Sequence, residues 1–215
     1  MSYKNPILVS GETYHIYNRS LQQTPIFKNA HDCSRFIDIV KYYLQETPPV
    51  KFSQYKNNRD KFKLDFNKPI VKIISFVLMP THFHFELRQE KDHGILKFIQ
   101  KTCNSFSHFY NLKHRNKGPL FESTFRAVRI ESNEQLLHLS RYIHLNPVTS
   151  FLVKNPEDYE FSSYGDFLGN KKFSFLDPSL VLKQFKNFSK YQQFVNDQSD
   201  YQKQLGEIKQ LIIER

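Results

Sequence analysis

Two histidines separated by a single residue carry the clearest chemical signal in the sequence. His82 and His84 lie in the segment Leu-Met-Pro-Thr-His-Phe-His-Phe-Glu-Leu at 78–87. Because side chains of a strand alternate between its faces, both imidazoles should project from one side, with Phe83 and Phe85 directed into a core. Imidazole is the commonest metal ligand in proteins, so the pair indicates a divalent metal site. The alternative is two surface histidines on a polar sheet face.

A tyrosine and an asparagine form a second candidate group. The segment 141–148 reads Arg-Tyr-Ile-His-Leu-Asn-Pro-Val, and it places Tyr142 and Asn146 four residues apart on one face of an expected helix. An amide oxygen is a suitable ligand for a hard divalent ion. A phenol with a pKa of about 10 is a weak nucleophile, but a metal that polarises a phosphate makes the attack feasible. The alternative for Tyr142 is a half-buried tyrosine at a domain edge.

The elements before the histidines should provide a strand, a helix and a second strand. Residues 13–18 are rich in aromatic and β-branched side chains, which predicts a strand. Residues 31–45 carry one apolar stripe at helical spacing and end before Pro48 and Pro49. Residues 51–68 are basic and without a clear period, which favours a solvated loop; the alternative is a flexible arm that touches phosphates. Residues 70–79 form a long apolar strand that pairs with the histidine strand.

The elements after the histidines complete the pattern. Residues 94–114 predict a helix, 125–130 a strand, and the capping pair Ser132 and Gln135 opens a helix that should end near residue 145, before Pro147. The order strand, helix, strand, strand, helix, strand predicts an α+β chain with a ferredoxin-like (RRM-like) antiparallel sheet and helices on one face. The other face stays open for a ligand, and the histidines should lie there.

The chain divides into two predicted parts. Residues 1–165 form the core domain, and residues 166–215 form a mostly helical C-terminal extension. Small amphipathic pieces are expected at 161–167 and 179–193, and a terminal helix is expected at 201–215. This tail contains no readable chemistry.

Composition adds an expectation about partners. The chain has 215 residues and a net charge of +10, and all of the excess lies in residues 1–150, with 22 Lys/Arg against 12 Asp/Glu. A localised positive field attracts polyanions, most often nucleic acid. Two cysteines, the absence of a signal-peptide pattern and the absence of a long apolar run predict a cytoplasmic protein without a membrane contact.

Three motifs in order resemble one family. Met-Pro-Thr-His-Phe-His at 79–84 resembles the histidine–hydrophobic–histidine (HUH) motif, Tyr-His-Ile-Tyr-Asn-Arg at 14–19 resembles the opening strand, and 141–148 resembles the catalytic-tyrosine helix. Together they resemble the single-tyrosine HUH transposases, specifically the REP-associated tyrosine transposase branch, over about residues 10–165. Thr81 stands where Asn or Glu is usual, and Asn146 stands where other insertion-sequence members carry Gln.

The resemblance implies roles for four residues. His82, His84 and Asn146 would be ligands of Mg²⁺ or Mn²⁺, and Tyr142 would be the nucleophile that forms a 5′-phosphotyrosine link. The substrate implied is single-stranded DNA with a hairpin or palindromic repeat, which is cleaved and rejoined. Relatives include monomers and homodimers.

Several other residues are weaker predictions. Contacts to nucleic acid are assigned to five basic side chains: Arg19, Lys97, Lys101, Arg126 and Arg129. His138 lies one turn before Tyr142 and is a possible proton acceptor for the phenol, although a solvent-facing helix histidine is the alternative. His15 and His144 are read as structural or surface residues.

Other functions compete with the transposase interpretation. A ferredoxin-like sheet also suits a non-catalytic protein that binds single-stranded nucleic acid by stacking bases on aromatic side chains. A phosphoesterase needs two His-x-Ser/Thr copies, and a structural zinc site needs a closed shell of four ligands; the sequence offers neither.

Overall fold

A four-stranded antiparallel sheet forms the centre of the computed structural model, which describes residues 5–122 and 124–197. Its strands are β1 (Thr13–Arg19), β2 (Val71–Met79), β3 (His82–Gln89) and β4 (Arg126–Arg129). They lie in the order β2-β3-β1-β4, and each neighbouring pair is antiparallel. Two interleaved strand–helix–strand units give this order, so the predicted ferredoxin-like sheet is confirmed.

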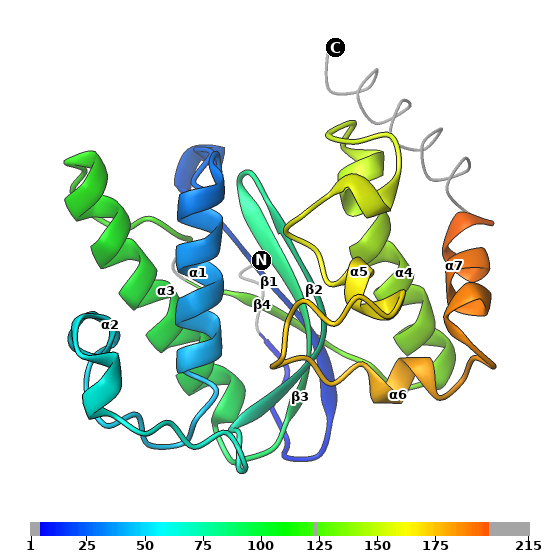
Figure 1. Cartoon of the computed structure of the whole chain (residues 1–215), viewed down its shortest axis with the longest axis horizontal. Coiled ribbons are helices and arrows are strands. Elements are labelled where there is room, and N and C mark those ends of the chain that lie inside the picture. Colours follow the sequence, from blue (N-terminus) through cyan, green and yellow to red (C-terminus); the bar gives the residue numbers. More distant parts are fainter. Residues whose placement is uncertain (1–4, 123, 198–215) are drawn as a thin grey trace.

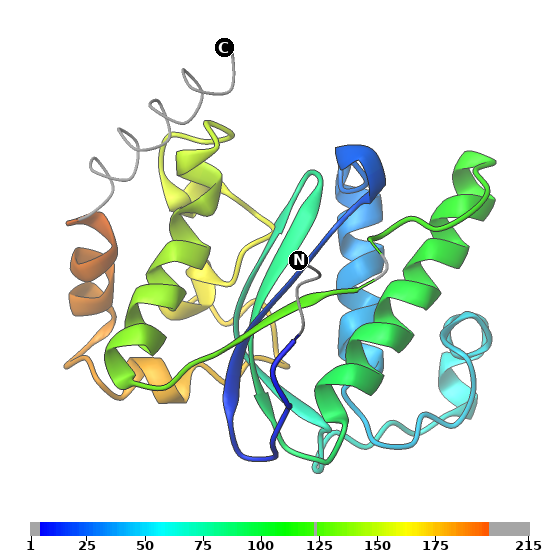
Figure 2. The same cartoon turned by 180° about the vertical axis from the view of Figure 1, so that it is seen from behind.

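Helices cover the two faces of the sheet unequally. The helices α1 (Ala30–Tyr42) and α3 (Gly94–His114) lie together on one face, as predicted. On the opposite face, α4 (Asn133–Thr149) packs against β2 and β3, with α7 (Phe188–Asn196) outside it (Figures 1 and 2). The face that carries the histidines is therefore covered beside β2 and leaves the β1 side more accessible.

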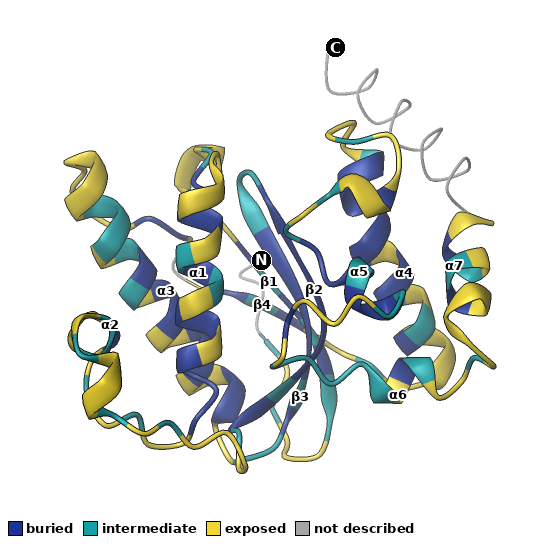
Figure 3. Cartoon of the chain, in the orientation of Figure 1, coloured by how far each residue is buried: buried dark blue, intermediate teal, exposed yellow. Residues whose placement is uncertain are grey.

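The main core lies between the sheet and the pair α1 and α3. Phe83 and Phe85 point into it from β3, and their rings lie 5.4 and 6.5 Å from the ring of Phe36 on α1. Phe98 and Phe106 close the core from α3. Figure 3 shows this layer as the buried side of both helices. Each buried phenylalanine contributes about 1.5–3 kcal/mol, so the aromatic layer dominates the stability of this half.

A second hydrophobic cluster joins the C-terminal segments to the sheet. Its members come from β2, α4 and the residues after 160: Ile74, Leu136, Leu145, Tyr164, Phe167, Val181, Tyr191 and Val195. The described part of the predicted extension, residues 166–197, thus packs on α4 and β2. The expected helix at 201–215 lies outside the described residues.

The remaining helices among the described residues are short. They are η1 (Leu21–Gln23), α2 (Phe52–Asn57), η2 (Arg59–Lys61), η3 (Pro156–Asp158), α5 (Tyr164–Phe167) and α6 (Ser179–Leu182). The pieces α5 and α6 fall within the two stretches predicted as amphipathic, and α7 begins in the second stretch and runs three residues past its predicted end.

The expectation of a structureless loop at 51–68 is wrong in its first part. The helix α2 forms there because Phe52 is buried and the ring of Tyr55 stacks on Tyr42 at 4.7 Å. The backbone N–H of Phe52 also donates to the hydroxyl of Tyr43 at 3.4 Å. Tertiary contacts with α1, which leave no periodic pattern in a six-residue helix, hold this segment in place.

The predicted end of α4 is also wrong. The helix starts as expected, with Ser132 Oγ accepting from the backbone N–H of Gln135 at 3.1 Å, but it runs through Pro147 to Thr149. The φ angle of proline suits a helix, and near the C-terminus the ring removes a single hydrogen bond. The backbone N–H of Ser150 donates to Asn146 O and that of Leu152 to Pro147 O, which closes the helix end.

Candidate functional site

The strand β3 presents the two histidines on the face opposite the phenylalanine core. In the antiparallel register, His82 pairs with Arg19 and His84 pairs with Tyr17 on β1. Directly paired residues of an antiparallel sheet share a face, so Arg19 and Tyr17 border the imidazoles. The rings of His82 and His84 lie 5.0 Å apart and nearly perpendicular, at 89°. The two rings therefore lie side by side on one face of the sheet without stacking.

Both imidazoles are fixed through the same nitrogen. Nδ1 of His84 lies 2.9 Å from Nε2 of His15, and Nδ1 of His82 lies 3.0 Å from the hydroxyl of Thr81. Within the described part of the chain, these contacts occupy Nδ1 of each ring and leave Nε2 as the nitrogen available to a ligand. A hydrogen bond to the other ring nitrogen is the usual way in which a protein orients a metal-binding histidine.

Burial keeps the histidines neutral. It lowers the pKa of His15 to about 4, and burial together with the charge of Arg19 lowers the pKa of His82 to about 4. The pKa of His84 lies well below its usual value because of burial first, and then because of His15, His82 and Arg19. Neutral imidazole is the form that binds a metal, so near neutral pH these rings need lose no proton to become ligands.

The helix α4 brings Tyr142 to the histidines. Ile143 packs against Val77 and Met79 of β2, which fixes the helix on the sheet. The ring of Tyr142 then lies edge-on to His84, with 5.6 Å between the ring centroids and 84° between the planes. The side chain keeps 43% of its surface exposed. A partly exposed tyrosine from α4 thus lies beside an imidazole from β3.

Asn146 is buried one turn beyond Tyr142. Only 6% of its surface is exposed, and its Nδ2 has no hydrogen-bond partner among the described residues. The unpaired group is an N–H donor, and leaving it buried without a partner costs about 1–3 kcal/mol, which a hydrogen-bond acceptor on a bound ligand could offset. The described residues contain no cluster of three His, Cys, Asp or Glu side chains suited to a metal ion. Beyond the two imidazoles, the amide oxygen of Asn146 is the further donor that could complete a site for Mg²⁺ or Mn²⁺, and this ligand set stays a prediction.

Two of the predicted basic residues lie on the face of the site. Arg19 borders His82, and its charge depresses the pKa of both histidines. Arg126 on β4 pairs with Tyr17 on β1, so Arg126 also lies on the face that carries the histidines. Both therefore lie on the face of the sheet that carries the histidines, and their contact with a phosphate stays a prediction.

The other predicted basic residues lie elsewhere. Arg129 pairs with Tyr14, on the opposite face, and makes a 3.0 Å ion pair with Glu12. Lys97 and Lys101 are exposed on α3, which covers the far face of the sheet. The sheet therefore separates these two lysines from the histidines.

His138 is engaged away from Tyr142. Its Nδ1 accepts from Arg141 Nη2 at 2.7 Å, and its Nε2 lies 3.7 Å from a carboxylate oxygen of Glu134. These contacts favour the interpretation of a solvent-facing helix histidine over that of a proton acceptor.

His15 is the site residue that sequence reasoning missed. It lies on β1 with its ring stacked on His84 at 5.1 Å and edge-on to Tyr142 at 6.2 Å. The alternation of buried Tyr14 and Ile16 around it signals its face. The register of β1 against β3, which brings it to His84, leaves no mark in a single sequence.

Comparisons with known proteins support the fold. No protein-family model matches the sequence, and no curated protein matches it. Among solved structures, a REP-associated tyrosine transposase bound to a REP hairpin matches with a TM-score of 0.56 and 18% identity, over 83% of this chain and 90% of that one. A "putative transposase" from Deinococcus radiodurans R1 matches with a TM-score of 0.38 and 12% identity, over 66% of this chain and 95% of that one. At these identities the first match shows a common fold, and the second is too distant to carry an argument.

Proposed function

We propose that this chain is a transposase-type DNA endonuclease that cleaves and rejoins single-stranded DNA beside a hairpin. The observation that carries the proposal is the meeting of Tyr142 on α4 with His84 on β3, at 5.6 Å between ring centroids. The fold shared with a tyrosine transposase solved on a REP hairpin supports the same conclusion. The basic first 150 residues supply the attraction for a DNA strand.

Tyr142 is the nucleophile in this proposal. Its phenolic oxygen bonds to the phosphorus of a phosphodiester, the bond from phosphorus to the 3′-oxygen breaks, and the phenol loses its proton. The products are a 5′-phosphotyrosine link and a free 3′-hydroxyl, so the phosphodiester energy is retained. Attack of a 3′-hydroxyl on the link reverses the chemistry and rejoins a strand. The exposure of Tyr142 lets the DNA backbone reach it.

The remaining side chains position the phosphate. His82, His84 and Asn146 are the residues that would hold Mg²⁺ or Mn²⁺. When bound, the ion supplies charge that makes the phosphorus more electrophilic. Arg19 adds positive charge at the same face, and His15 fixes the ring of His84.

A covalent-adduct assay tests the proposal. With Mn²⁺ and a labelled hairpin that has a single-stranded flank, the wild-type chain should form a protein–DNA adduct stable to denaturation. Tyr142→Phe removes only the nucleophilic oxygen, so adduct formation should fall by at least about a thousandfold while hairpin binding persists.

Tyr17 provides the matched control. Its ring also lies near His84, at 5.5 Å, so Tyr17→Phe tests a second phenol in the same site. Tyr17→Phe should retain the adduct. If Tyr17→Phe lost the adduct and Tyr142→Phe kept it, Tyr17 and not Tyr142 would be the nucleophile. If the wild type bound the hairpin but formed no adduct, the result would instead support a non-catalytic nucleic-acid-binding protein.

A further inference from the structure

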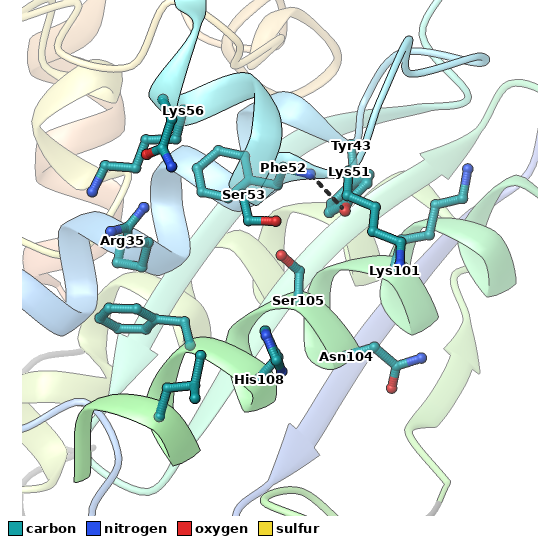
Figure 4. Close-up of a pocket in the computed structure, with 13 residues that line it drawn as sticks. Arg35, Tyr43, Lys51, Phe52, Ser53, Lys56, Lys101, Asn104, Ser105 and His108 are labelled. Atoms are coloured by element: carbon teal, nitrogen blue, oxygen red, sulfur yellow. Dashed lines mark hydrogen bonds between the residues drawn. The ribbon is translucent and has the colours of Figure 1, made fainter. Parts of the chain in front are cut away.

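A groove on the far face of the molecule is lined by cations from three helices. It has a volume of about 630 Å³ and lies between α1, α2 and α3. Arg35, Lys51, Lys56 and Lys101 contribute positive charge, and the described residues that line the groove include no Asp or Glu. Figure 4 shows Arg35 and Lys56 at one end and Lys51 and Lys101 at the other, with Ser53 and Ser105 between them. Cations at both ends match an extended polyanion better than one small anion.

The groove is a fixed part of the fold, since α2 is docked by contacts at its start and along its length. Phe52 is 4% exposed, and its ring lies 5.4 Å from that of Tyr42. The hydroxyl of Tyr42 donates to Val50 O at 2.7 Å, just before the helix begins. Lys51 and Lys56 are therefore held opposite α3. The segment 51–68 carries six Lys/Arg against two Asp/Glu, and two of these six cations, Lys51 and Lys56, line the groove.

The positive charge of the groove is incompletely balanced. Asp38 does not line the groove, but its charge acts on Arg35 and Lys56, and its carboxylate lies 3.4 Å from Arg59. Burial lowers the pKa of Arg35 and of Lys56, and nearby cations lower both further, against the opposing effect of Asp38. An anion that approaches crowded cations of this kind lowers their electrostatic free energy.

The lining favours phosphates over bases. The guanidinium of Arg35 lies over Phe109 at 4.6 Å and near Phe52 at 5.7 Å, so it already covers the aromatic rings on which a base could stack. Besides Leu112, the groups that remain are cations, hydroxyls, the amides of Asn57 and Asn104, and the imidazole of His108. These are the side chains that contact phosphate and sugar without reading sequence.

We infer that the groove between α1, α2 and α3 binds the sugar–phosphate backbone of DNA, independently of its sequence. This surface lies across the sheet from Tyr142, so it would hold a segment of the DNA other than the one cleaved. The identification of the polyanion as DNA rests on the proposed function, whereas the phosphate chemistry of the groove does not.

A salt titration of binding tests the inference. The probe is a fluorescent DNA hairpin with a single-stranded flank, and a second hairpin of scrambled sequence is its partner. The variant Lys51→Gln/Lys56→Gln/Lys101→Gln removes three cations without touching the core. The slope of log K against log salt should become shallower by about 2 to 3, and Kd at low salt should rise at least about tenfold, equally for both hairpins.

A variant with the same loss of charge elsewhere is the control. Lys183→Gln/Lys186→Gln/Lys190→Gln changes three exposed lysines near α6 and α7 and should leave the slope nearly unchanged. Equal effects in both triple variants, an unchanged slope in the groove variant, or no DNA binding by the wild type would overturn the inference.

The outcomes separate the groove from the catalytic proposal. The adduct yield per bound complex reports cleavage by Tyr142, whereas the salt slope of binding reports the groove. If the wild type binds DNA through the groove but forms no adduct, the proposed cleavage fails and the groove stands. If adducts form normally and the slope is unaffected by the groove lysines, the groove fails and the cleavage stands.

Discussion

His15 decides how the neighbouring histidine presents its free nitrogen. Its contact with Nδ1 of His84 at 2.9 Å fixes the tautomer and the ring orientation. We predict that His15→Leu weakens Mn²⁺ binding by about 10–100-fold, because His84 loses its orienting partner. Calorimetric titration with Mn²⁺ measures this directly. His15→Gln, whose amide oxygen can still accept from Nδ1–H of His84, should recover part of the affinity, and equal affinities for wild type and His15→Leu would contradict a positioning role.

The same residues show what a sequence reveals about a site. The period of two in a strand placed His82 and His84 on one face, and the period of a helix placed Tyr142 with Asn146. The resemblance to HUH transposases provided the roles. His15 remained hidden because its partner is 69 residues away, and only the pairing of β1 with β3 brings them together. Helical spacing predicts that Lys97 and Lys101 share one face of α3. It does not predict which face of the sheet α3 covers, and so it does not separate these lysines from the site.

At the level of elements, a buried histidine joins α4 to the segments that follow it. Nδ1 of His144 lies 2.7 Å from the hydroxyl of Tyr191, and its Nε2 lies 2.8 Å from the hydroxyl of Ser163. Burial lowers the pKa of His144 to about 3. Between that value and the ordinary 6.5, the unfolded chain binds a proton that the folded chain does not. The stabilising effect is therefore complete above about pH 6.5 and is lost as the pH falls toward 3.

We predict a measurable pH dependence from this junction. His144→Gln removes the titrating group, so the fall in the free energy of unfolding between pH 7 and pH 5 should be smaller than in the wild type. The difference should approach about 1.4 kcal/mol for each pH unit below 6.5. Urea denaturation at the two pH values measures it. Parallel losses in both proteins would show that His144 does not titrate on unfolding.

The elements themselves differed in how far the sequence predicted them. The predicted bounds of α3, 94 and 114, are those found in the structure, because the apolar stripe that marks this helix in the sequence is long. The helix α2 was missed because six residues carry no readable period and its stability comes from Tyr42 and Tyr43. The end of α4 lies beyond the predicted one because proline is a helix-stop signal in a sequence, whereas here its φ angle suits the helix and Pro147 is followed by only two more helical residues.

For the whole molecule, the strand–helix order was enough to predict the ferredoxin-like sheet but not how the C-terminal segments pack. Residues 166–197 share a hydrophobic cluster with α4 and β2, and none of the described helices is long and apolar enough to span a membrane. We predict that a chain ending at residue 165 loses at least about 3 kcal/mol of stability, because Leu136 and Leu145 lose their apolar partners. A chain ending at residue 197 keeps every described contact and is the matched control. Thermal denaturation of the two should give clearly different midpoints, and equal midpoints would contradict a shared core.

The segment after α4 also lies along the outer side of β2. The backbone N–H of Leu78 donates to Phe161 O at 2.9 Å, that of Ser163 donates to Phe76 O at 3.0 Å, and that of Asp177 donates to Ile73 O at 2.9 Å. An uncovered outer strand is a template on which a foreign strand can grow, with aggregation as the usual result. Here the chain's own backbone occupies the edge of β2 at these three positions, so at these points the strand has no free backbone group to offer a second chain.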